Sequence, residues 1–173
     1  MLGETASMDQ AYNIEAWKDY AIMVGGASAA LAGMLIVALT INIEEIVRFA
    51  YLPRRAMSAL VVLMTPLIVA VLVLVPGQSD EAVGIELAVF ASLVGVVLFR
   101  QLGRYDPDSQ RTREQWYLGI CGPFLLAVAA LLLAGVGLAT GAIGGLLWLV
   151  PFVIAAIVGG TAQVWVLLVE VRR

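Results

Sequence analysis

The most constraining feature of this chain is an uncharged segment from Tyr20 to Asn42, which contains about 23 residues. At ~1.5 Å per residue, a helix of this length crosses the roughly 30 Å hydrocarbon core of a bilayer. We therefore predict that the segment spans a membrane. Three of its small residues, Gly25, Ala29 and Gly33, recur at every fourth position and predict a smooth face for close helix packing. We expect the other helices to pack around this first span.

Composition extends the prediction to the whole chain. Of the 173 residues, 62% are hydrophobic and only 13% are charged, which is too apolar for an ordinary soluble domain. We predict an all-α membrane protein with a single transmembrane domain, residues 20–173, preceded by a polar extracytoplasmic segment, residues 1–19. The expected spans are residues 20–42, 56–75, 82–102, 116–138 and 146–169.

A short helix at the membrane interface is expected after the first span. In residues 43–52, the apolar side chains share one helical face and the charged side chains share the other. Pro53 is expected to end this helix, and Arg54 and Arg55 are expected to begin the second span.

The positions of the basic residues predict the orientation. They gather in the first loop, the third loop and the carboxyl-terminal tail, whereas the second and fourth loops have none. Under the positive-inside rule, this alternation places the amino terminus outside and the carboxyl terminus in the cytoplasm. It also supports the span at residues 82–102, although that segment contains Glu86 and Arg100.

Small residues recur in two later spans and predict further close packing there. The third span carries Gly84, Ala88, Ala91, Ser92 and Gly95, and the fifth carries Ala155, Ala156, Gly159 and Gly160.

Residue types that serve catalysis or metal binding are scarce. The chain has no histidine, and its one cysteine, Cys121, excludes an internal disulfide and a thiolate metal cluster. Asp106 and Asp108 in the third loop offer two carboxylates, but a metal-dependent membrane phosphotransferase needs more acids at fixed helical spacing. We interpret this loop as a solvated turn and expect no catalytic residue, no metal and no cofactor.

Three polar residues within the spans are candidates for contact with an ion or a pore: Glu86, Thr65 and Gln163. A carboxylate at the depth of Glu86 could bind a cation or relay a proton. The alternative for all three is hydrogen bonding within or between helices. Glu170, beside Arg172 and Arg173, is expected to form a local ion pair.

Arginines near the cytoplasmic ends of the spans are expected to contact anionic lipid headgroups, at ~1 kcal/mol each. These residues are Arg54, Arg55, Arg104, Arg111 and Arg113. Because the basic residues are spread over separate segments, nucleic-acid binding is not expected.

Three segments carry a resemblance to a known family: WKDYAIMVGGASAALAGMLIVALTIN at residues 17–42, LPRRA at residues 52–56 and LVPGQ at residues 74–78. They resemble small polytopic integral membrane proteins of bacteria, of the actinobacterial type. The resemblance covers roughly the first half of the chain. It implies a bacterial plasma membrane and provides no catalytic residues.

These observations favour a non-enzymatic membrane protein that works by association, either with itself or as an accessory subunit of a larger membrane complex. A small oligomeric transporter or channel is the alternative, with a pore between subunits because five helices enclose little aqueous space. An enzyme acting on lipid headgroups through residues 106–113 is a third hypothesis. The expected partners are the lipid bilayer and either a second copy or another membrane protein.

Overall fold

The computed structural model describes residues 10–48, 52–102 and 122–171. Of these residues, 91% are helical and none forms a strand, which confirms the predicted all-α class. The five long helices are α2 (Lys18–Ile41), α4 (Leu52–Leu74), α5 (Asp80–Leu102), α7 (Gly122–Thr140) and α8 (Leu149–Val171). The short elements are η1 (Ile14–Trp17), α3 (Ile43–Arg48) and η3 (Gly145–Trp148).

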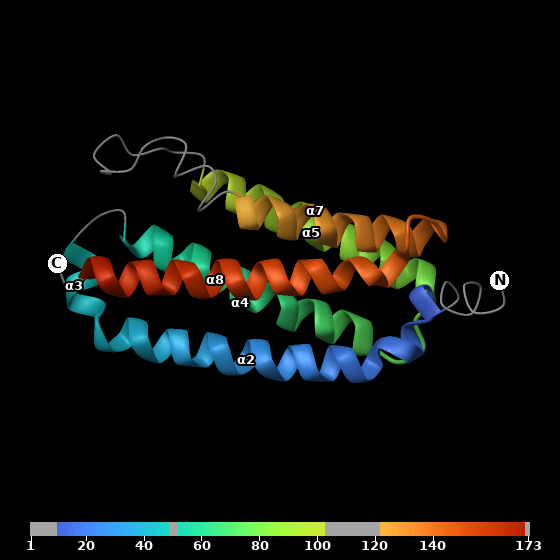
Figure 1. The fold of residues 1–173 in the computed structure, drawn as a ribbon, viewed down its shortest axis with the longest axis horizontal. Coiled ribbons are helices and arrows are strands. Elements are labelled where there is room, and N and C mark those ends of the chain that lie inside the picture. The colour runs from blue at the N-terminus through green and yellow to red at the C-terminus, as the bar shows by residue number, and fades with distance from the viewer. Residues whose placement is uncertain (1–9, 49–51, 103–121, 172–173) are drawn as a thin grey trace.

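The long helices lie side by side in a bundle (Figure 1). Helix α2 packs mainly on α4, α8 packs on both α4 and α7, and α5 packs mainly on α7. In the most apolar part of α2, 28% of the residues are buried, compared with 50% in α4 and α8. The expectation that the other helices surround the first span is therefore wrong. Helix α4 occupies the central place because its buried side chains meet neighbours on several sides.

Helices α2 and α5 begin and end within two residues of the predicted first and third spans. Helix α4 begins at Leu52, four residues earlier than predicted, so Pro53 does not end the preceding helix but lies in the first turn of α4. Proline is favoured there because the first backbone N–H groups of a helix have no intrahelical partner. Residues 116–121 of the predicted fourth span lie outside the described residues.

The predicted interfacial helix forms α3, which the structure describes from Ile43 to Arg48; residues 49–51 lie outside the described residues. Its Ile46 is buried beside Leu52 and Ala56, at the start of α4, while Ile43 and Val47 are exposed. One apolar side chain thus attaches α3 to the bundle, and the other two point away from it.

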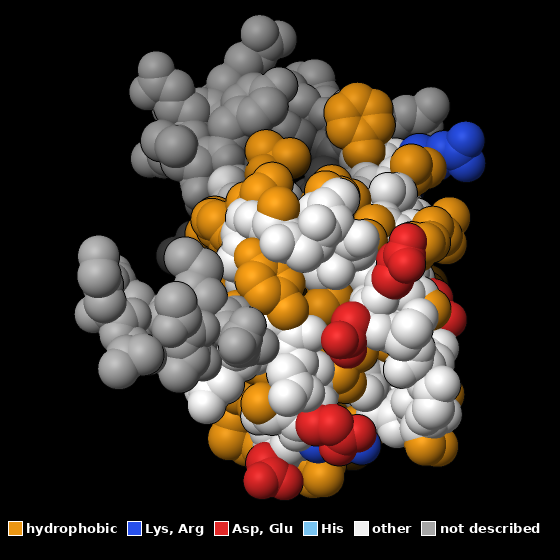
Figure 2. All heavy atoms as spheres, turned by 90° about the vertical axis from the view of Figure 1, so that its right-hand side faces the viewer, with side chains coloured by type: hydrophobic (Ala, Val, Ile, Leu, Met, Phe, Trp, Pro, Cys, Tyr) orange, Lys and Arg blue, Asp and Glu red, His pale blue; other side chains and the backbone are white. Residues whose placement is uncertain are grey.

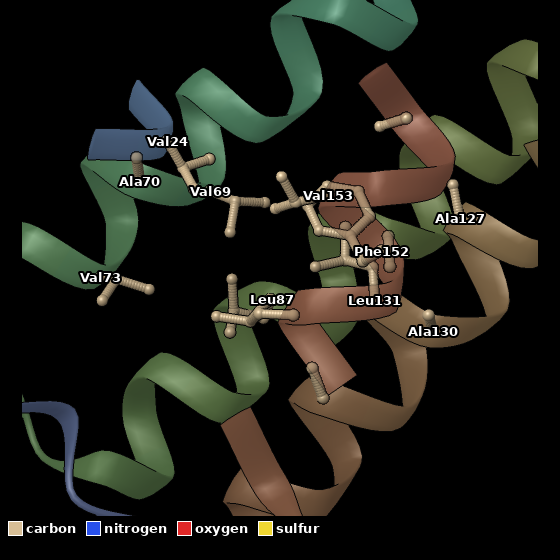
Figure 3. Close-up of a cluster of buried hydrophobic side chains, with 14 of the residues drawn as sticks. Val24, Val69, Ala70, Val73, Leu87, Ala127, Ala130, Leu131, Phe152 and Val153 are labelled. Carbon is tan, nitrogen blue, oxygen red and sulfur yellow. The ribbon is translucent and has the colours of Figure 1, made fainter. Parts of the chain in front are cut away.

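The largest buried cluster joins all five long helices. Phe152 of α8 lies in it with only 1% of its surface exposed, together with Leu131 of α7 and Leu87 of α5 (Figure 3). On the α4 side, the cluster continues through Val69 and Val73. Helix α8 therefore connects the α2–α4 pair to the α5–α7 pair through its own buried side chains.

Helices α5 and α7 approach each other most closely at two glycines. A Cβ atom placed on Gly84 would lie 2.5 Å from the backbone nitrogen of Ala139, and one on Gly135 would lie 2.5 Å from that of Ala88. Real Cβ atoms do not approach backbone atoms this closely. The predicted packing role of the small residues in the third span is therefore confirmed at Gly84 and Ala88.

Candidate functional site

The predicted packing residues divide into a buried group and an exposed group. Gly25 packs on α4, where an added Cβ would lie 3.1 Å from the Ala70 Cβ, and Gly159 packs on Pro123 of α7. Ala155 is also buried, with 6% of its surface exposed. These three residues pack against other parts of the chain.

Ala29 and Gly33 are exposed, so the predicted stripe is not the surface that α2 uses against α4. A helix turns by about 100° per residue, and positions four apart therefore drift by ~40° at each step. Two steps carry Gly33 well away from the line of Gly25. The buried residues of α2 are instead Ala21, Val24, Gly25, Ser28, Ala32 and Leu35.

The outward side of α2 combines small and large apolar residues. We call the group Gly26, Ala29, Ala30 and Gly33 the exposed α2 face. Among the described residues, no atom outside the helix lies within 4 Å of a Cβ placed on Gly26 or Gly33. Exposed apolar side chains border this face, namely Ile22, Met23, Met34 and Val37. Four small residues thus form a shallow surface that no described part of the chain covers.

Glu86 is half-buried and has a hydrogen-bond partner. The Gln78 side chain, in the turn between α4 and α5, donates from Nε2 to Glu86 Oε1 over 2.9 Å. The Gln78 Oε1 atom is buried and has no partner among the described residues. The structure therefore places the Glu86 carboxylate in a local contact near the start of α5.

Thr65 and Gln163 also have hydrogen-bond partners, one within its own helix and one on a neighbouring helix. The Thr65 hydroxyl donates to the Val61 carbonyl of its own helix over 2.7 Å, and Ser58 Oγ of α4 donates to Gln163 Oε1 of α8 over 3.3 Å. By helical rise, Glu86 lies ~9 Å from the start of α5, whereas Thr65 and Ser58 lie ~14 and ~24 Å from the end of α4. The structure does not bring the three candidates into one polar site.

Two small, partly open cavities lie between the helices, each of about 10 Å³. One lies between α2, α4 and α8 and is bordered by Trp17, Tyr20 and Pro66. The other includes Thr65 beside Phe124 and Phe152. Each volume is close to the minimum for a single water molecule, so neither cavity has room for an organic ligand.

The two ends of the bundle differ in charge. At the end where α2 and α5 begin, exposed acidic side chains stand apart from one another among apolar ones (Figure 2), and they include Glu15, Asp19, Asp80 and Glu81. The opposite end carries Arg48, Arg54, Arg55 and Arg100. Arg54 is exposed at the start of α4 and Arg55 is half-buried.

Other predicted candidates cannot be placed. Arg104, Asp106, Asp108, Arg111, Arg113 and Cys121 lie outside the described residues, as does the side chain of Glu170. Within the described ranges, no group of three or more His, Cys, Asp or Glu side chains could hold a metal ion.

Sequence reasoning missed three polar residues that form long-range or interhelical contacts: Tyr12, Ser58 and Gln78. Only Gln78 gave a signal, since it directly follows a Pro-Gly turn and precedes a helix that carries an acid. A lone serine and a tyrosine in a polar segment gave none, because their partners lie 105 and 132 residues away.

The described residues contain five helices long and apolar enough to cross a membrane: Ile14–Ile41, Leu52–Leu74, Asp80–Arg100, Gly122–Thr140 and Gly145–Val166. By length and composition, the fold is that of a multi-pass helical membrane protein. Comparisons with protein-family models, with curated proteins and with solved structures found no match.

Replacement of Gln163 tests how much this polar residue contributes to the stability of the fold. Its Nε2 atom is buried without a partner among the described residues, and burying an unpaired donor costs free energy. We expect Gln163→Leu to change the free energy of unfolding by less than about 1 kcal/mol, since an interhelical hydrogen bond in a membrane averages only ~0.6 kcal/mol. Denaturant unfolding in bicelles measures this. A loss of several kcal/mol would contradict it.

Proposed function

We propose that this protein works by helix-mediated association in the membrane, as a homo-oligomer or as an accessory subunit of a membrane complex, and not by catalysis. One observation supports the proposal most: the exposed α2 face consists of four small residues on which no described part of the chain packs. In lipid, small residues allow close backbone approach between helices, and van der Waals packing then drives association.

The same proposal includes a location and an orientation. We place the protein in a bacterial plasma membrane with its amino terminus outside. The arginines at the end where α4 begins favour the cytoplasmic side for that end, and the acidic opposite end fits the outer surface. The bacterial assignment rests on the resemblance of residues 17–42, 52–56 and 74–78.

No observation favours a channel through one chain, because the three polar candidates have separate partners and the cavities are small. If flux exists, its path lies between subunits, and the same association surface is needed to form it.

The test is the mass of the protein extracted directly into native lipid nanodiscs. We expect either a discrete homo-oligomer or a complex with one larger membrane protein. In the double variant Gly26→Leu with Gly33→Leu, we expect at least a tenfold loss of that complex, because two large side chains prevent close approach of a partner helix.

The matched control is Ile154→Leu with Val158→Leu, which enlarges or reshapes exposed side chains of α8 without touching α2. It is expected to leave the complex intact. A wild-type protein that is monomeric in nanodiscs and yields no partner after crosslinking in membranes would refute the proposal.

A further inference from the structure

The segment before α2 is folded and packs on the turn between α7 and α8. We call residues 10–17 the strap. Within it, Trp17 Nε1 donates to the Gln10 carbonyl over 2.9 Å, and Asn13 Oδ1 accepts from the Glu15 backbone N–H over 3.0 Å. These two bonds join residues of the strap to one another.

The strap docks on the turn between α7 and α8, which lies beside it in Figure 1. Ala11 and Ile14 are buried there, with 1% and 7% of their surfaces exposed, and Ile14 belongs to the same cluster as Leu146 and Leu149. A Cβ atom on Gly145 would lie 2.7 Å from the Ala11 carbonyl oxygen. The contact is therefore close enough to require glycine on the turn.

One peptide unit of this turn is held at both of its ends. The Ile143 carbonyl accepts a hydrogen bond from Trp148 Nε1 over 2.6 Å, and the adjoining Gly144 N–H donates to the Tyr12 hydroxyl over 2.9 Å. The first bond is local, whereas the second comes from the strap. Docking of the strap thus helps to fix the orientation of the 143–144 peptide.

The turn that the strap holds is strained. Ile143 has a φ of 64°, in the left-handed region that β-branched residues rarely occupy, and its side chain is 58% exposed. Such a conformation persists only when surrounding contacts impose it. Three hydrogen bonds adjoin it: those of Tyr12 and Trp148, and one from the Ala142 N–H to the Gly137 carbonyl over 3.0 Å. Loss of the strap removes one of them and leaves the turn free to relax.

The strap also provides a link between α2 and α8 that the helices themselves make only weakly. Helix α2 itself packs on α4 and has few contacts with α8. The small cavity bordered by Trp17, Tyr20 and Leu149 lies directly under this link. Because Trp17 belongs to the strap, release of the strap would remove one wall of that apolar cavity between α2, α4 and α8.

From these contacts we propose that the strap and the turn at residues 141–148 form one conformational switch, which opens as a unit at this end of the bundle while the long helices stay folded. The proposal does not depend on association. The switch has a docked state with a strained turn and a released state in which the turn relaxes and the cavity loses its Trp17 wall.

Hydrogen–deuterium exchange of the full chain in nanodiscs holding a single copy tests this switch, with the amides of α5 and α7 as an internal reference for folding. We expect the strap and the turn to exchange at matching rates, well above those of α5 and α7. In Tyr12→Phe, which keeps the ring and removes the hydroxyl, both segments are expected to exchange about fivefold faster.

Ile143→Asn is the second variant, because asparagine tolerates a positive φ and so relieves the strain of the docked state. It is expected to slow exchange in the strap, although the substitution lies in the turn. Faster exchange of the strap alone in Tyr12→Phe would show that the two segments open separately and would overturn the proposal. Exchange of both segments as slow as that of α7 would overturn it as well.

Discussion

A single methyl group at Gly84 is expected to destabilise the bundle by about 1–3 kcal/mol, the usual cost of overpacking. In Gly84→Ala, the new Cβ would meet the Ala139 nitrogen at 2.5 Å and the Gly135 carbonyl oxygen at 2.8 Å. Both atoms belong to the backbone of α7, so neither can move without displacing the helix. The free energy of unfolding in bicelles, measured by denaturant titration, gives the effect.

Gly26→Ala, measured in bicelles that hold a single copy, is the matched control, since no described residue outside α2 lies within 4 Å of the new Cβ. Alanine is the better helix former by about 1 kcal/mol in water, so this variant is expected to be neutral or slightly more stable. The same sign of change in both variants would contradict the observed contact between α5 and α7.

The partner residue gives an independent check of the same contact. Gly135→Ala places its Cβ 2.5 Å from the Ala88 nitrogen, on the reciprocal side of the interface. Once one methyl group has separated the helices, the second methyl group adds a smaller steric cost. We therefore expect the double variant Gly84→Ala with Gly135→Ala to lose less stability than the sum of the single variants.

Most of the fold could be predicted because bilayer thickness fixes the length of an apolar helix. Five spans and the all-α class follow from hydropathy, and the boundaries of α2 and α5 agree within two residues. Pro53 misled the prediction because the same residue type ends one helix and starts another. Only the position of Leu52 against Ile46 shows which of these roles it has.

Helix neighbours were harder to predict than helix boundaries. Small residues indicate a surface suited to packing, but they do not predict which helix packs there. Gly84 and Gly159 contact neighbours within the chain, whereas Gly33 contacts none among the described residues. In the sequence the three look alike, and only the arrangement of α4 at the centre and α2 at the edge separates them.

The partners of the polar candidates could not be predicted from the sequence either. Glu86, Thr65 and Gln163 were grouped because each is polar within an apolar span. Sequence gives their depth in the membrane but not the direction of each side chain. The bonds from Gln78 to Glu86 and from Ser58 to Gln163 depend on a turn geometry and on a helix pair that the chain order alone does not specify.

Truncation of Phe152 to alanine is expected to cost about 3 kcal/mol or more, within the range known for buried phenylalanine. Its side chain is 1% exposed and borders a cavity of about 10 Å³ that Phe124, Leu131 and Val62 also line. The truncation therefore enlarges an existing void instead of opening one at a site that could collapse. Denaturant titration in bicelles measures the loss.

The control for this variant is Ile154→Ala, half a turn away on α8, whose side chain is 59% exposed. Lipid chains fill the space left by that truncation, so the expected change is below about 0.5 kcal/mol. Benzene should restore part of the stability of Phe152→Ala, because an apolar cavity of sufficient size binds it, and should leave Ile154→Ala unchanged. Equal losses in the two variants would mean that Phe152 faces lipid, contrary to its place between α4 and α7.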